Sequence, residues 1–162
     1  MIFTTKAEYG VRLLIQLGLR AKAGPVLLKA VAAAENLPLA YLERIAALLK
    51  KANLVVATRG AHGGYLLAQP AEDITMDVVV LALEGAIAPM DCFLEEDRSG
   101  RVSCSHHTDA EHCATKLMWT RVQMGVIRSL QRTTLAELVE FTAKPVRVPP
   151  AGELSDPPLS IN

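Results

Sequence analysis

The chain has 162 residues, 51% of them hydrophobic, which is enough for one domain with a real core. No apolar run approaches the 18 or so residues needed to cross a membrane, and the N-terminus lacks the basic start and apolar middle of a signal peptide, so we expect a cytoplasmic protein without a membrane partner. The net charge of zero divides unevenly along the chain. Residues 1–64 carry nine Lys/Arg and three Asp/Glu, a net charge of +6, whereas residues 65–162 carry eight Lys/Arg and fourteen Asp/Glu, a net charge of −6. The basic half suggests that the partner is a polyanion such as nucleic acid.

Helical periodicity predicts three helices in the first third of the chain. The first runs from a cap at Thr4 or Thr5 to Gly24, the second covers 27–35, and the third covers 39–52. Two short helices joined by a short turn form either a helix-turn-helix or an ordinary αα-hairpin, and both interpretations stay open at this point. The inner face of the third helix is predicted to hold Leu42, Ile45, Leu48 and Leu49, with Asn53 ending it.

A β-hairpin is predicted directly after these helices. Residues 54–58 and 65–67 have strand character, and the intervening turn contains Gly60, Gly63 and Gly64, which permit positive φ where a hairpin reverses. A hairpin in this position is typical of a wing, and Arg59 and His62 at its tip could reach phosphate or enter a minor groove. The alternative is a plain solvent-exposed hairpin.

The second half is predicted to contain a helix over 76–85, a longer helix over 111–131, and a short helix from Thr133 or Thr134 to Phe141. The long helix has apolar residues on two sides, so both sides must be covered. We interpret it as a dimerisation helix, with an internal helix of the monomer as the alternative. The tail from residue 144 is proline-rich and is expected to be disordered.

Residues 92–113 contain all three cysteines and three of the four histidines on a polar stretch with little to bury. An odd number of cysteines argues against a disulfide framework, so metal binding or redox chemistry is the better interpretation. From the residues alone, an iron–sulfur cluster and zinc are equally compatible with thiols and imidazoles. A surface loop with free thiols is a further alternative.

The order of these parts resembles the bacterial winged-helix regulators that bind iron–sulfur clusters, the family of IscR, NsrR and RirA. The resemblance covers residues 1–142 and is carried by TTKAEYGVRLL, PLAYLERIAALLKKANLV, TRGAHGGYLLAQP and the cysteines ahead of a Trp-bearing helix. It implies a mainly α fold with a small β-hairpin wing, a winged helix-turn-helix plus a long dimerisation helix. It also implies a homodimer that binds double-stranded, pseudo-palindromic operator DNA.

The resemblance also implies an iron–sulfur cluster, either 2Fe–2S or 4Fe–4S, held by Cys92, Cys104 and Cys113. Eleven and then eight residues separate these cysteines, which is longer than is usual in the family. Lys116 occupies the position of the histidine ligand in IscR-like members, whereas Glu8 matches the acidic ligand that NsrR-like members take from the partner subunit. We therefore expect Glu8 of the partner chain as fourth ligand. The possible substitutes are His106, His107 and His112.

DNA contacts are expected from the N-terminal end of the third helix and from the wing, as in other helix-turn-helix proteins. The resemblance implies base contacts from Glu43 and Arg44 and a minor-groove contact from Arg59. Lys50 and Lys51 would bind phosphate or simply form a solvated face. The full set of candidate DNA-binding residues is Leu39, Ala40, Tyr41, Glu43, Arg44, Lys50, Arg59, His62 and Gly63.

We thus expect a DNA-binding domain over 1–86, a cluster-binding loop over 87–113, a dimerisation region over 111–143 and a disordered tail over 144–162. A cluster with one weak ligand would be labile, which suits a repressor that senses nitric oxide, redox state or iron supply. The alternatives are a zinc-binding or cluster-free thiol regulator, or an electron-transfer protein. No nucleophile–base pair, phosphate loop or nucleotide fingerprint supports an enzyme with a small-molecule substrate.

Overall fold

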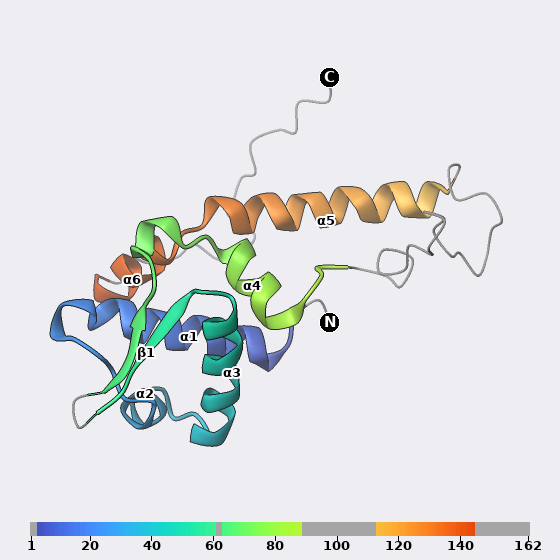
Figure 1. Cartoon of the computed structure of the whole chain (residues 1–162). Coiled ribbons are helices and arrows are strands. Elements are labelled where there is room, and N and C mark those ends of the chain that lie inside the picture. The colour runs from blue at the N-terminus through green and yellow to red at the C-terminus, as the bar shows by residue number, and fades with distance from the viewer. Residues whose placement is uncertain (1–2, 61–62, 89–112, 145–162) are drawn as a thin grey trace.

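The structure, a computed structural model, describes residues 3–60, 63–88 and 113–144 (Figure 1). The described part is mainly helical with one two-stranded antiparallel hairpin, which confirms the predicted fold class. The elements, in chain order, are α1 (Thr5–Leu19), α2 (Leu28–Glu35), α3 (Leu39–Lys51), β1 (Val55–Thr58), β2 (Gly64–Leu67), α4 (Met76–Glu84), α5 (Ala114–Arg132) and α6 (Leu135–Ala143), with short 3-10 turns at Ala21–Ala23 and Ala71–Asp73.

Helix α1 is the centre of the body and contacts α2, α3, α4, α6 and β2. In the view of Figure 1, α2 and α3 lie on one side of it and α4, α5 and α6 on the other. Its inward side chains Leu13, Leu14 and Leu17 are fully or almost fully buried. Leu135, at the start of α6, is also fully buried, so the last described helix shares the core of the N-terminal helices.

Two glycines let neighbouring helices approach α1 closely. A Cβ atom added to Gly10 would lie 2.2 Å from Leu83 Cδ1 of α4, and one added to Gly18 would lie 2.5 Å from Val139 Cγ2 of α6. Glycine lowers helix propensity by about 1 kcal/mol relative to alanine. Here that cost is offset by the close packing of α4 and α6 against α1, for which a side chain at either position would leave no room.

The inner face of α3 differs from the prediction at one position. Leu42, Ile45 and Leu49 are buried as expected, but Leu48 is 36% exposed. Each helical residue is rotated by about 100° from its neighbour, so Leu48 lies off the buried stripe that the other three residues form. Asn53 adopts the left-handed conformation (φ 56°) and its amide donates to the Lys50 carbonyl, so it ends α3 as predicted.

Strands β1 and β2 pair from Val55 opposite Leu67 to Thr58 opposite Gly64, and Tyr65 also bridges Val26 in the segment before α2. The hairpin is therefore attached to the helix-turn-helix by backbone hydrogen bonds in both directions between Val26 and Tyr65, of 2.8 and 2.9 Å. Gly60 has the expected positive φ, at 113°. At Gly63, glycine is needed because a Cβ would lie 2.3 Å from the Thr58 carbonyl oxygen.

Helix α5 extends as an arm beyond the body (Figure 1) and contacts α4, where Gln123 Nε2 donates to the Ile87 carbonyl at 2.6 Å. It begins at Ala114, with Cys113 as N-cap, while the predicted start at Glu111 lies outside the described residues. None of its residues is buried. Its exposed large apolar side chains are Leu117, Met118, Val122 and Met124.

The described helices include none that is long and apolar enough to span a lipid bilayer.

Candidate nucleic-acid interface and cluster ligands

The turn between α2 and α3 places the start of α3 on the surface. Asn36 ends α2 in the left-handed conformation with φ 52°, and its amide donates to the Ala32 carbonyl. Pro38 follows as the N-cap of α3, where its fixed φ suits a helix start. The predicted DNA-binding residues of this end that are exposed are Leu39, Ala40, Glu43 and Arg44.

Tyr41 differs from these neighbours because it is half-buried and packs against the core. Its ring meets that of Tyr9 of α1 nearly at right angles, with centroids 5.7 Å apart. Edge-to-face packing of this kind is favourable for aromatic rings. Through its ring, Tyr41 therefore anchors the first turn of α3 to α1.

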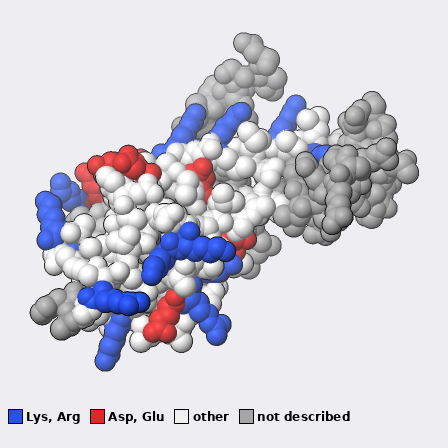
Figure 2. All heavy atoms as spheres, viewed as in Figure 1, with Lys and Arg blue, Asp and Glu red and all other residues white. Residues whose placement is uncertain are grey.

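The surface around α2, α3 and the hairpin is rich in cations. Figure 2 shows Lys and Arg side chains over the part of the body where α2 and α3 lie. Residues 1–64 contain three acidic residues, and two of them, Glu8 and Glu35, are paired with Arg12. The exposed Lys and Arg residues of this half other than Arg12 are Lys22, Lys29, Arg44, Lys50, Lys51 and Arg59.

The predicted wing residues occupy different environments. Arg59 is exposed at the end of β1, where it can meet a large anion. Gly63 is buried, and its amide already donates to the Gly60 carbonyl at 2.9 Å, so the described turn uses this amide internally. His62 lies outside the described residues.

Of the predicted cysteine ligands, Cys113 is described, while Cys92 and Cys104 lie outside the described residues, as do His106, His107 and His112. Cys113 is half-buried, and its Sγ accepts a hydrogen bond from the Lys116 amide at 3.4 Å. The first turn of a helix thus offers peptide N–H groups to this sulfur. Within the described ranges, no three His, Cys, Asp or Glu side chains gather where they could hold a metal ion.

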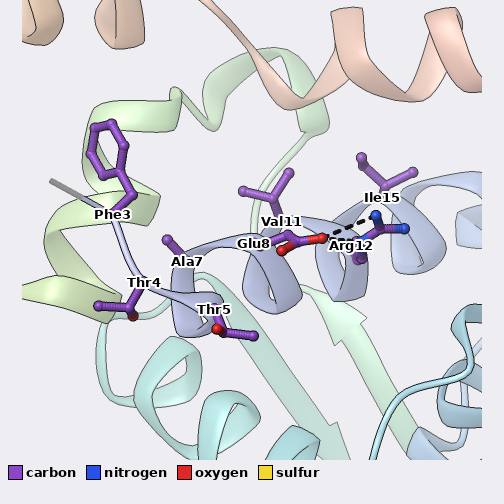
Figure 3. A pocket seen from close by; sticks show the side chains of 8 residues that line it. All are labelled: Phe3, Thr4, Thr5, Ala7, Glu8, Val11, Arg12 and Ile15. Carbon is purple, nitrogen blue, oxygen red and sulfur yellow. Dashed lines mark hydrogen bonds and ion pairs between the residues drawn. The ribbon is translucent and has the colours of Figure 1, made fainter. Parts of the chain in front are cut away.

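Glu8 lines a shallow pocket along the exposed side of α1 (Figure 3). Its Oε1 accepts from Arg12 Nη2 at 3.1 Å, and Arg12 Nη1 donates to Glu35 Oε2 at 3.0 Å. Hydrogen bonds from Arg12 to Glu35 and then to Glu8 raise the pKa of the Arg12 guanidinium above its ordinary value. The remaining lining residues are Phe3, Thr4, Thr5, Ala7, Val11 and Ile15.

The structure does not bring Glu8 and Cys113 together within one chain. The N-terminal end of α5 projects away from the body that contains α1 (Figure 1). A site using both residues would therefore combine them from two different chains.

One polar cluster was not visible in the sequence. Glu84, the last residue of α4, accepts hydrogen bonds from the Thr4 amide (3.0 Å), the Thr4 hydroxyl (2.5 Å) and the Ala7 amide (3.2 Å), and it pairs with Lys6 at 3.7 Å. These contacts join residues some 80 positions apart, so no local pattern indicates them. Burial raises the pKa of Glu84, but these hydrogen bonds and Lys6 outweigh it and leave the pKa below its ordinary value.

A helix-turn-helix followed by a hairpin, with an exposed N-terminal end of α3 and a cation-rich surface, defines a winged-helix protein of the DNA-binding class. The family model for Rrf2, described as an iron-dependent transcriptional regulator, matches residues 3–141. The chain therefore belongs to the Rrf2 family of transcriptional regulators, which are not enzymes.

Individual relatives agree with this assignment. The chain is 35% identical to protein rrf2 of Nitratidesulfovibrio vulgaris, over 86% of this chain and 87% of that protein. It is 32% identical to the HTH-type transcriptional regulator CymR of Bacillus subtilis, over 88% of this chain and 92% of CymR. It is 31% identical to the regulator IscR of Photobacterium profundum, over 86% and 76% of the two chains.

Two solved structures show the same fold. The structure of CymR, the global cysteine regulator of B. subtilis, superposes with a TM-score of 0.70 at 32% identity, covering 86% of this chain and 96% of CymR. That of T. potens IscR superposes with a TM-score of 0.69 at 31% identity, covering 90% and 93%. The fold is thus equally similar to a protein named for cysteine regulation and to one named IscR.

Proposed function

We propose that the protein is a homodimeric repressor that binds a pseudo-palindromic operator and whose affinity for DNA is switched by an iron–sulfur cluster. The observation that carries the proposal is the exposed N-terminal end of α3 with Glu43 and Arg44, together with exposed cations of residues 1–64 that include Arg59 of the wing. This arrangement suits a helix in the major groove and a hairpin on the adjacent backbone.

Each described side chain has a chemically defined role in this proposal. Glu43 can accept from cytosine N4, and Arg44 can donate to guanine or to phosphate. Arg59 can enter a narrow minor groove, where the negative potential is strongest. Lys50, exposed in the last turn of α3, supplies a sequence-independent phosphate contact.

A second copy of the chain is proposed to cover α5. Leu117 and Met118 are 56% and 50% exposed, and they lie on an arm that the described part of its own chain does not cover. Burying such side chains against another copy would remove apolar surface from water. A two-fold dimer would then present its two α3 helices to half-sites about one helical turn apart.

The described candidate ligands have the chemistry that an iron–sulfur cluster needs, and a cluster could reach them. Thiolate sulfur is the preferred ligand of cluster iron, and Cys113 is half-buried rather than sealed in the core. The Glu8 side chain is 57% exposed, so a group outside its own chain can reach it. Cys92, Cys104, Cys113 and the partner chain's Glu8 would hold the cluster. When bound, the cluster supplies a centre that nitric oxide, oxygen or iron loss can take apart.

A second candidate is a cluster-free regulator that responds to cysteine or to thiol oxidation. The likeness to CymR favours it, because CymR is named a cysteine regulator and is as similar to this chain as the IscR proteins are. What favours the cluster is the chain itself, which places all three of its cysteines within residues 92–113. Three thiols in one segment can hold iron together.

An anaerobic preparation distinguishes these candidates. We expect brown protein that contains iron and acid-labile sulfide and whose affinity for a promoter fragment changes when the cluster is removed. Colourless protein without iron that still binds the fragment, with an affinity that depends on added cysteine or on thiol oxidation, would support the second candidate instead.

A further inference from the structure

The last turn of α4 is joined to the first turns of α1 by both polar and apolar contacts. Glu84 accepts from the Thr4 amide, the Thr4 hydroxyl and the Ala7 amide, which are donors at the N-terminus of α1. The Glu84 side chain is only 11% exposed, although Thr4 itself lies on the surface. We call this set of contacts the Glu84 clasp.

The apolar contact lies beside the clasp. Leu83, the residue before Glu84, packs directly against Gly10, where a Cβ would come within 2.2 Å of Leu83 Cδ1. Packed surfaces that fit this closely transmit a displacement because they cannot compress. A movement of the last turn of α4 therefore moves the first turns of α1 as well.

The same turns of α1 support the recognition helix. Tyr9 lies between Ala7, which donates to the clasp, and Gly10, which contacts Leu83. Its ring packs edge to face on Tyr41 in the first turn of α3, immediately before Glu43 and Arg44. A continuous path of contacts thus leads from Glu84 to the end of α3 that faces DNA in our proposal.

The other end of this path leads toward the cysteines. Gly85 ends α4 with φ 81°, and Cys92 follows eight residues after Glu84. The Ile87 carbonyl, three residues after Glu84, accepts from Gln123 of α5, the helix that begins directly after Cys113. The chain before the cysteine segment and the helix after it are therefore joined beside the last turn of α4.

We infer that Glu84 is a positioning residue that transmits the state of the cysteine segment to the recognition helix, through the Glu84 clasp, α1 and the Tyr9–Tyr41 pair. The inference rests on the proposed function, because it needs a cluster-dependent change in the affinity for DNA. Glu84 itself binds neither cluster nor DNA in this scheme. Its role is to couple the position of the first turns of α1 to that of the last turn of α4.

The test compares Glu84→Gln and Glu84→Ala with Glu140→Gln, which removes an exposed carboxylate from α6, far from the clasp in sequence. Three quantities are measured: iron content, hydrogen exchange at the Thr4 and Ala7 amides, and the ratio of the operator dissociation constants of cluster-loaded and cluster-free protein. A typical coupling between two sites changes affinity at least about five-fold.

We expect the Glu84 variants to keep their iron, to exchange the Thr4 and Ala7 amides faster, and to show an affinity ratio close to one. Glu140→Gln should retain the ratio of the unmodified protein. Faster exchange with an unchanged ratio would overturn the inference while leaving the proposed function intact. If the two dissociation constants are equal in the unmodified protein, the cluster does not switch DNA binding. The proposed function is then wrong, and there is no signal for Glu84 to transmit.

Discussion

The ring of Tyr41, in the first turn of α3, rests edge to face on the ring of Tyr9 in α1, with an interplanar angle of 86°. The sequence suggested Tyr41 as a DNA contact, because it lies at the N-terminal end of a recognition helix. Its half-buried position adds a second role, which is to hold that end of α3 against the core. These two roles belong to different parts of the side chain, the hydroxyl and the ring.

Substitutions of Tyr41 can separate these roles. Tyr41→Phe keeps the ring, so it should leave the stability close to that of the unmodified protein and should weaken operator binding only through the lost hydroxyl. Tyr41→Ala removes the ring pair and its buried area, and we expect a loss of about 3 kcal/mol in the free energy of unfolding together with weaker DNA binding. Urea denaturation and a fluorescence-anisotropy titration measure the two effects. A large loss of affinity in Tyr41→Phe would show that the hydroxyl contacts DNA.

Glu43 and Lys50 should differ in the kind of DNA binding they support. Glu43→Ala should relax discrimination at one base pair per half-site, by roughly 1–3 kcal/mol. Lys50→Ala should weaken binding to all sequences and lower the salt slope by about one unit for each phosphate that is no longer neutralised. Titrations of matched and mutated operators at several salt concentrations measure both. The assignment of Glu43 to base contact is wrong if its removal weakens binding to every sequence equally.

Each cysteine of the segment should be required for the cluster. Replacing Cys92, Cys104 or Cys113 by Ala should abolish the visible absorption of anaerobically purified protein, because two thiolates and one weak ligand hold iron poorly. Circular dichroism should stay unchanged. For Cys113 the structure supports this expectation, because α5 is also held by contacts with α4. A variant that retains full iron content would remove its cysteine from the site.

Glu8 and Arg12 allow a test of the fourth ligand. Arg12 Nη2 lies 3.1 Å from Glu8 Oε1, so it competes with any iron for this carboxylate. We expect Glu8→Ala to form a cluster that is lost faster, and Arg12→Gln to form one that is lost more slowly. The decay of the visible absorption in the presence of a chelator gives both rates. If Glu8→Ala decays like the unmodified protein while a variant of His106, His107 or His112 loses the cluster, a histidine is the ligand.

Stability should depend on pH through Glu84. Its pKa is lowered in the folded protein, so its carboxylate contributes its full stabilisation above the unfolded-state pKa of about 4.3 and loses it as the pH falls through the lower, folded-state value. Glu84→Gln should therefore reduce the unfolding free energy of cluster-free protein by about 1–2 kcal/mol at neutral pH. Urea denaturation from pH 7 downward should show this difference narrowing below about pH 4.3. A difference that is independent of pH would contradict the assignment.

Local patterns predicted most of the fold. Apolar spacing located α1, α3 and α4, and the glycines between Arg59 and Tyr65 located the hairpin, because these signals depend on neighbours in sequence. Leu48 was assigned wrongly because an apolar residue beside a buried stripe fits a helical pattern nearly as well as one within it. Glycine is required at position 63 because the Thr58 carbonyl lies too close for a Cβ, and the sequence alone does not reveal this contact.

The candidate site was less predictable, because its contacts join distant residues. The sequence led us to predict DNA contacts at the start of α3, but it did not indicate that Tyr9 supports Tyr41 from another helix. The pairing of Glu8 with Arg12 at i+4 spacing could have been read from the sequence. The contact between Arg12 and Glu35 depends on how α1 and α2 are placed, and periodicity does not give this placement.

The contact between Gly18 of α1 and Val139 of α6 has a consequence for synthesis on the ribosome. Helix α1 is made first and α6 last among the described helices, yet the core that surrounds α1 includes Leu135 of α6. Domains tend to fold as units while the chain emerges. A nascent chain that ends before α6 therefore lacks part of this core, and by the time α6 emerges, every cysteine has already left the ribosome. In our proposal, iron could thus meet the cysteines before the core beneath the DNA-binding surface is complete.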